Sequence, residues 1–84
     1  MTLRPRPDVA WQELDGAVVI VDLDGRVALG LNASGSLLWR RLCAHGREGL
    51  ERTLAQAYGL SPEAAEKDVQ AFVALLQERG LVEA

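Results

Sequence analysis

The chain has few of the residues on which several classes of protein depend. Its 84 residues include one cysteine, Cys43, and one histidine, His45, and only 5% are aromatic. A single thiol excludes an intrachain disulfide, and so few aromatic rings argue against a stacking surface for single-stranded nucleic acid. Lysine and arginine number 9 against 12 aspartates and glutamates, for a net charge of −3. Nucleic-acid binding would need clustered cations, so we expect none.

Long hydrophobic runs are also missing. No segment reaches the roughly 18 apolar residues that a membrane span requires, and the N-terminal MTLRPRPDV lacks the apolar centre of a signal peptide. We therefore expect a cytoplasmic protein without membrane contact. Cys43 and His45 lack a third metal ligand or an orienting acid, and no glycine-rich phosphate loop is present, so we expect no enzyme activity, no metal and no cofactor.

The first part of the chain has the pattern of an antiparallel sheet. Residues 1–8 carry Pro5 and Pro7 and indicate an extended arm without ladder hydrogen bonds. Asp-Gly pairs between apolar runs favour hairpins, because a type I′ turn needs positive φ at both central residues. Two such pairs, at 15–16 and 24–25, predict a three-stranded meander with strands at 9–14, 17–23 and 26–31.

The rest of the chain is predicted to be helical. Asn32 is a good N-cap for a helix over 33–44, which Gly46 ends. A second helix over 48–58 lacks a capping residue at its start. Ser61-Pro62-Glu63 strongly indicates the start of a third helix, which runs to Arg79. The sequence therefore predicts a single α+β domain over 9–84, with the meander followed by three helices.

The third predicted strand leaves an open edge. Edges are usually protected by lysine, proline or inward charges, and Val27–Leu31 contains none of these. Such an edge aggregates, dimerises or accepts a partner strand. The third predicted helix has a wider apolar arc than a core stripe needs. Two interpretations stay open: the helix is deeply buried, or the flank with Ala71, Phe72 and Leu75 borders a groove beside the third strand.

Two segments of the chain resemble a known family. LGLNASG at 29–35, with Leu38-Trp39 and Leu42 behind it, is similar to the strand-to-helix signature of PqqD-like proteins. The segment from Asp68 to Val82 resembles that family's last helix and C-terminal tail. The resemblance implies a winged helix-turn-helix-like fold and a recognition element for ribosomally made, post-translationally modified peptides, in pathways such as lasso peptide or pyrroloquinoline quinone synthesis.

The resemblance also implies partners and a site. The partners would be the leader region of a precursor peptide and a modifying enzyme, such as a radical SAM enzyme or a leader peptidase. The free-standing length suggests a separate peptide chaperone. The leader would add as a strand to the third strand beside the third helix, with charged residues on the helix selecting leader charge. The predicted peptide-binding residues are Val27, Ala28, Leu29, Gly30, Leu31, Asp68, Val69, Ala71, Phe72, Leu75 and Arg79.

Two other functions compete with leader binding. A winged helix could bind DNA, but the third helix carries an excess of acidic side chains where a phosphate surface would need cations. The open edge could instead pair with a second copy of the chain and form a homodimer. The pattern of the edge does not separate self-pairing from leader pairing.

Overall fold

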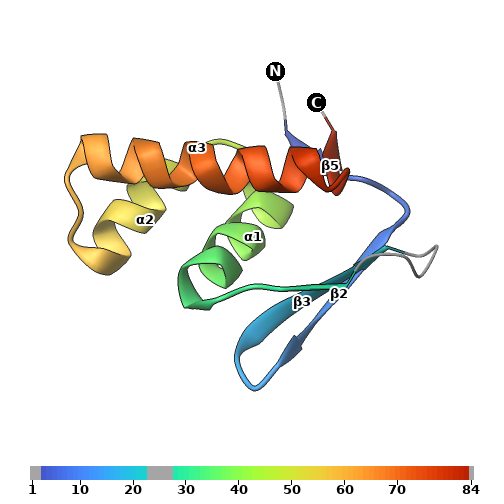
Figure 1. The fold of residues 1–84 in the computed structure, drawn as a ribbon. Coiled ribbons are helices and arrows are strands. Elements are labelled where there is room, and N and C mark those ends of the chain that lie inside the picture. Colours follow the sequence, from blue (N-terminus) through green and yellow to red (C-terminus); the bar gives the residue numbers. More distant parts are fainter. Residues whose placement is uncertain (1–2, 23–27, 84) are drawn as a thin grey trace.

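The fold combines a small antiparallel sheet with three helices, in a computed structural model that describes residues 3–22 and 28–83. Figure 1 shows α3 lying across α1 and α2, with the sheet below them. The predicted α+β fold, a three-stranded meander followed by three helices, is confirmed. The second Asp-Gly pair and Val27 lie outside the described residues. The elements are β1 (Arg4–Pro5), β2 (Val9–Leu14), β3 (Ala17–Asp22), β4 (Ala28–Gly30), α1 (Ala33–His45), α2 (Leu50–Tyr58), α3 (Pro62–Glu78) and β5 (Val82–Glu83).

The main sheet has the order β2-β3-β4, with both pairs antiparallel. Asp15 and Gly16 join β2 to β3 and have φ values of 54° and 83°. Leu14 lies opposite Ala17, so the loop has two residues. Positive φ at both positions of a two-residue loop is typical of the type I′ turn. The first of the two predicted hairpins is therefore confirmed.

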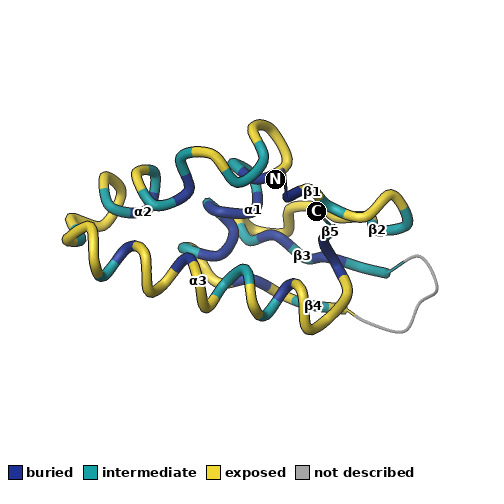
Figure 2. Tube along the Cα trace, turned by 90° about the horizontal axis from the view of Figure 1, so that it is seen from above, coloured by how far each residue is buried: buried dark blue, intermediate teal, exposed yellow. Residues whose placement is uncertain are grey.

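The core lies between one face of this sheet and the helices. Val18 and Ile20 on β3 are fully buried, as is Trp39 on α1, and the ring of Trp39 meets Trp11 of β2 edge to face at 6.4 Å. Figure 2 shows the buried positions gathered along the facing sides of the helices and β3. The opposite face of the sheet has no element packed on it in the part of the chain that the structure describes (Figure 1).

The N-terminal segment differs from its prediction. Residues 1–8 were expected to make no ladder bonds, but Arg4–Pro5 form β1, which pairs with β5 near the C-terminus. Pro5 has no N–H to donate, and the neighbouring Arg6 N–H donates to the Leu81 carbonyl at 3.0 Å instead. Leu3 is buried in the core beside Leu81, so this short pairing anchors both ends of the chain (Figure 1).

The helix boundaries follow the capping pattern. The Asn32 Oδ1 accepts a hydrogen bond from the Gly35 N–H at 2.8 Å, and the Ser61 Oγ accepts one from Ala64 at 3.2 Å. The start of α2 has no side chain that caps the helix, and its predicted boundary is wrong: α2 begins two residues later than predicted, after Gly49 with φ 78°. None of the helices among the described residues is both long and apolar enough to span a membrane.

Candidate functional site

A cleft of about 310 Å³ lies between β4 and α3. β4 and the start of α1 form one wall, α3 forms the other, and α2 contributes one residue to the floor. Its position follows from the topology, because β4 ends directly at the cap of α1 and α3 crosses above both (Figures 1 and 2). The lining residues are Leu29, Gly30, Leu31, Asn32, Ser34, Gly35, Leu38, Leu54, Asp68, Ala71, Phe72 and Leu75.

The cleft is apolar at its base and polar along part of its rim. Leu31, Leu38 and Leu54 are buried beneath it, while Phe72 and Leu75 remain partly exposed on its α3 wall. Pockets that bind peptide side chains combine an apolar interior with a few polar groups that fix orientation. This cleft therefore has the composition of a side-chain pocket.

Asp68 is the single charged residue among those that line the cleft. Its side chain is exposed and makes no hydrogen bond or ion pair within the described residues. Asn32 and Ser34 add polar groups at the same end, although the Asn32 Oδ1 is already occupied by the Gly35 N–H and the Ser34 hydroxyl. The polar part of the rim is thus acidic and unneutralised.

The register of β4 shows which of its backbone groups are free. The Leu31 N–H donates to the Val18 carbonyl at 2.9 Å, and Gly30 lies opposite Val19. In an antiparallel pair, residues alternate between those that bond to the neighbour and those that face away. Gly30, and by the same alternation Ala28, therefore directs its N–H and C=O away from β3. β4 is the last strand of its sheet in the described part of the chain, so these groups form an open edge.

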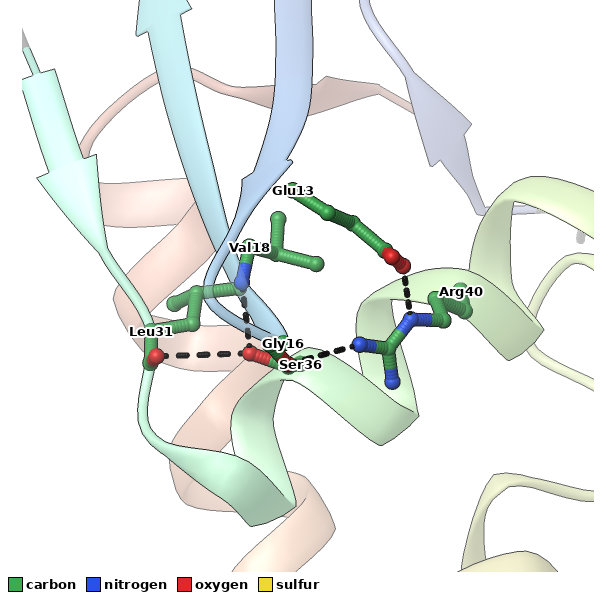
Figure 3. A network of polar contacts seen from close by, with 6 residues as sticks. All are labelled: Glu13, Gly16, Val18, Leu31, Ser36 and Arg40. Atoms are coloured by element: carbon green, nitrogen blue, oxygen red, sulfur yellow. Dashed lines mark hydrogen bonds and ion pairs between the residues drawn. The ribbon is translucent and has the colours of Figure 1, made fainter.

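The hydroxyl of Ser36 completes the pairing where β3 and β4 separate. Ser36 Oγ accepts a hydrogen bond from the Val18 N–H at 2.9 Å and donates one to the Leu31 carbonyl at 3.3 Å (Figure 3). Those two backbone groups would otherwise bond directly in an antiparallel ladder. Ser36 is fully buried, so this bridge joins α1, β3 and β4 in the interior beside the cleft.

A second polar link lies close to the Ser36 bridge, at the turn between β2 and β3. Figure 3 shows the Arg40 guanidinium reaching from α1 to the Glu13 carboxylate and to the Gly16 carbonyl, the latter at 2.9 Å. This link ties the β2-β3 turn to α1 from the solvent side. Because both residues are partly exposed, it contributes less to stability than the buried Ser36 bridge.

The structure brings most of the predicted site residues together. Val69 is the exception on α3: its side chain is fully buried and supports the cleft from inside the core. Ala28 is exposed on β4 next to the cleft, and Arg79 is exposed directly after α3. Val27 lies outside the described residues. The predicted residues that line the cleft are Leu29, Gly30, Leu31, Asp68, Ala71, Phe72 and Leu75.

Several lining residues were not predicted from the sequence. Asn32 was interpreted as a cap alone, but it also lines the cleft, together with Ser34, Gly35, Leu38 and Leu54. Gly35 has a local reason to be glycine, since a Cβ there would lie 3.2 Å from the Asn32 Oδ1 and 3.4 Å from the Leu31 Cβ. No sequence pattern distinguishes Leu54 from an ordinary core leucine.

The candidate chemical residues do not form a reactive site. Cys43 is on the surface of α1, yet partial burial of its thiol raises its pKa to about 11, so it is protonated at neutral pH. A protonated thiol is a weak nucleophile and a poor metal ligand. Within the described residues there is also no group of three or more histidine, cysteine, aspartate or glutamate side chains placed to hold a metal ion.

Comparison with known proteins gives consistent results for family and fold. The chain is similar to the solved structure of "TbiB1 in Complex with the TbiA(beta) Leader Peptide", at 26% identity and a TM-score of 0.89, covering 96% of this chain and 95% of that one. It is also similar to "Lasso peptide synthetase B1 complexed with the leader peptide", at 26% identity and a TM-score of 0.87, with both chains fully covered. Among curated protein sequences, none matches this chain.

A family model describes most of the chain. The model of Coenzyme PQQ synthesis protein D (PqqD) matches residues 17–82, which include β3, β4, all three helices and the start of β5. The match spans both segments on which the resemblance was recognised in the sequence. The cleft, the open edge of β4 and the Ser36 bridge all lie within it. The chain therefore belongs to the PqqD family.

Proposed function

We propose that this chain binds the leader region of a ribosomally made precursor peptide and presents it to a modifying enzyme. The leader adds as a fourth strand to the open edge of β4 and places side chains in the cleft against α3. One observation carries the proposal: the outward N–H and C=O groups of Ala28 and Gly30 lie beside an apolar cleft on the same edge.

The two parts of this surface have different roles in binding. Main-chain hydrogen bonds to the edge supply affinity that depends little on sequence, whereas a pocket for alternate side chains supplies selectivity. Phe72 and Leu75 offer partly exposed apolar surface to those side chains. A leader that is disordered when free loses conformational entropy on binding, so we expect affinities in the micromolar to high-nanomolar range.

Structural neighbours support this proposal. Both are described as complexes with a leader peptide, and both match this chain over nearly its whole length. Their names concern lasso peptides, while the family model is named for pyrroloquinoline quinone synthesis. We infer a precursor peptide as the ligand, and an enzyme of the radical SAM or leader peptidase type as the recipient of the bound leader.

A matched pair of variants at one position tests strand addition. Gly30→Pro removes the outward N–H, and Gly30→Ala keeps it while adding a Cβ that meets nothing within 4 Å. The probe is a fluorescently labelled leader peptide of the precursor that this chain serves, and its binding is measured by fluorescence polarisation. We expect Gly30→Ala to bind within about twofold of the natural protein and Gly30→Pro to lose at least about tenfold, since an unmade hydrogen bond at a desolvated edge costs roughly 1–3 kcal/mol.

Folding must be checked separately from binding. Circular dichroism and thermal melting of Gly30→Pro establish whether the domain is intact, and N-methylglycine at position 30, introduced by chemical synthesis, removes the same N–H with less restriction of φ. If either intact protein bound the leader as tightly as Gly30→Ala, strand addition at β4 would be wrong. Light scattering in the same samples tests the homodimer, which would show as a stable dimer that added leader does not change.

A further inference from the structure

One face of α3 carries a charge at each end and apolar side chains between them. Asp68, Phe72, Leu75 and Arg79 follow the spacing i, i+4, i+7 and i+11, which places them within about 60° of one another around a helix with 100° per residue. Arg79 keeps helical dihedral angles, φ −84° and ψ −3°, so it continues this face beyond the last residue of α3. We call these four residues the α3 stripe.

The α3 stripe faces the site of strand addition. Asp68, Phe72 and Leu75 line the cleft, and Arg79 lies one turn beyond Leu75 on the same face. Neither charged side chain has an ion-pair or hydrogen-bond partner within residues 3–22 and 28–83. The other charged residues next to the stripe, Lys67 and Glu78, lie about 80–100° around the helix from Asp68 and do not line the cleft. Two opposite charges are thus left unneutralised along the path of the added strand.

The relative directions of β4 and α3 give this charge pair an orientation. Figures 1 and 2 show that β4 runs toward the start of α1, while α3 runs the opposite way. Asp68, in the first half of α3, is therefore near the C-terminal end of β4, and Arg79 is toward its N-terminal end. Both pairs in this sheet are antiparallel, and antiparallel pairing is the more stable per residue. A leader added antiparallel to β4 runs from Asp68 toward Arg79.

We propose that the cleft selects leaders by charge order: a basic side chain, then an apolar one, then an acidic one, read from the N-terminus of the bound segment. This inference rests on the proposed leader binding and names the sequence class that the site accepts. The basic side chain meets Asp68, the apolar one packs on Phe72 and Leu75, and the acidic one meets Arg79.

The spacing of the recognised residues follows from the two geometries. Eleven residues of helix span about 16 Å, and a strand covers this length in about five residues. Side chains that share one face of a strand are an even number of residues apart. A separation of four positions, i and i+4, between the basic and acidic residues meets both conditions, because lysine, arginine and glutamate can lean outward by the remaining few ångströms. The apolar side chain is then midway between them.

Selection from random linear peptides displayed in vitro tests this inference with the natural protein as bait. Peptides that also bind Gly30→Pro are removed, so that the remaining pool depends on the β4 edge. We expect this pool to be enriched in a basic residue followed four positions later by an acidic one, with an apolar residue midway. A synthetic pair that exchanges the lysine and the glutamate of one selected peptide should differ in affinity by about fivefold to tenfold in low salt, and by less as salt screens the charges.

Charge variants separate the stripe from general electrostatics. Asp68→Lys should replace the preference for a basic residue at that end by a preference for an acidic one, and Arg79→Gln should remove the preference for the acidic residue at the other end. Glu66→Gln and Lys67→Gln change the charge of the same helix in the same direction as Asp68→Lys and Arg79→Gln, but neither residue lines the cleft, so both variants should leave the order preference unchanged.

The outcomes distinguish this inference from the proposed function. If no pool dependent on the β4 edge emerges, the proposed leader binding fails and the inference fails with it. If such a pool emerges with no charge order, or with a preference for the basic residue that Asp68→Lys does not remove, leader binding stands and the charge selection is refuted. Enrichment of the opposite order would show that the added strand is parallel to β4, which also contradicts the inference.

Discussion

Replacing Ser36 with alanine should destabilise the whole domain, although the change removes a single oxygen atom. The hydroxyl is fully buried and bridges the Val18 N–H and the Leu31 carbonyl. Without it, two buried backbone groups lose a partner, and each unsatisfied group costs about 1–3 kcal/mol. The bond to Leu31 is long at 3.3 Å, so we place the total near 2–3 kcal/mol.

This cost is large for a domain of this length. Stabilities of about 0.05–0.15 kcal/mol per residue give roughly 4–13 kcal/mol for the natural chain, so Ser36→Ala removes a substantial fraction. A loss of 2–3 kcal/mol should lower Tm by about 10–20 °C, since small domains shift by about 4–8 °C per kcal/mol. Urea denaturation followed by tryptophan fluorescence measures the free energy of unfolding. Trp39 on α1 is fully buried in the folded domain, so its fluorescence changes when α1 separates from the sheet.

A control on the same helical turn separates the bridge from helix propensity. Ser34→Ala removes a hydroxyl that donates only to the Asn32 side chain near the surface, at 3.1 Å, and should change stability by less than about 0.5 kcal/mol. Hydrogen exchange of the Leu31 amide should accelerate in Ser36→Ala and stay unchanged in Ser34→Ala. If Ser36→Ala cost less than about 0.5 kcal/mol with unchanged exchange at Leu31, β3 and β4 would have paired directly, and the reasoning about the bridge would be refuted.

Two further predictions concern the N-terminal strand and the cysteine. Leu3→Ala should cost about 2 kcal/mol in urea denaturation, because Leu3 is buried in the core under the β1-β5 pair, whereas Leu14→Ala, at a leucine that is 52% exposed, should cost less than about 0.5 kcal/mol. Equal losses from the two variants would contradict the role assigned to β1. Alkylation of Cys43 by iodoacetamide at pH 8 should be at least about tenfold slower than that of a free thiol, because its pKa of about 11 keeps the reactive thiolate scarce. The rate should keep rising with pH up to about 11, and a plateau near pH 9 would show that the thiol is not shifted.

Local residues determined much of the fold. The Asp15-Gly16 turn, the caps at Asn32 and Ser61 and the continuous apolar run of β3 each depend on neighbours within a few positions, so the meander and most helix boundaries could be predicted. The α2 boundary was placed two residues early because no side-chain cap marks it. β1 was missed because two residues around a proline carry no strand pattern, and only the return of β5 provides their partner.

The candidate site likewise has features that local signals predict and features that depend on tertiary packing. The open edge of β4 and the apolar flank of α3 could be predicted from the sequence, because strand order and helical periodicity follow from local signals. Ser36 and Leu54 could not be recognised, since their roles arise where α1, α2 and α3 meet the sheet. The family resemblance placed Val69 in the predicted site, whereas helical periodicity put it on the core side of α3, where the structure buries it.

The sequence by itself determined an α+β domain of the PqqD type with an unprotected strand beside a helix of wide apolar arc. Only the tertiary structure decided which backbone groups are free at that strand, because they depend on the register that Leu31 and Ser36 fix against Val18. It also decided which end of β4 lies nearer Asp68 and which nearer Arg79, because β4 and α3 run in opposite directions.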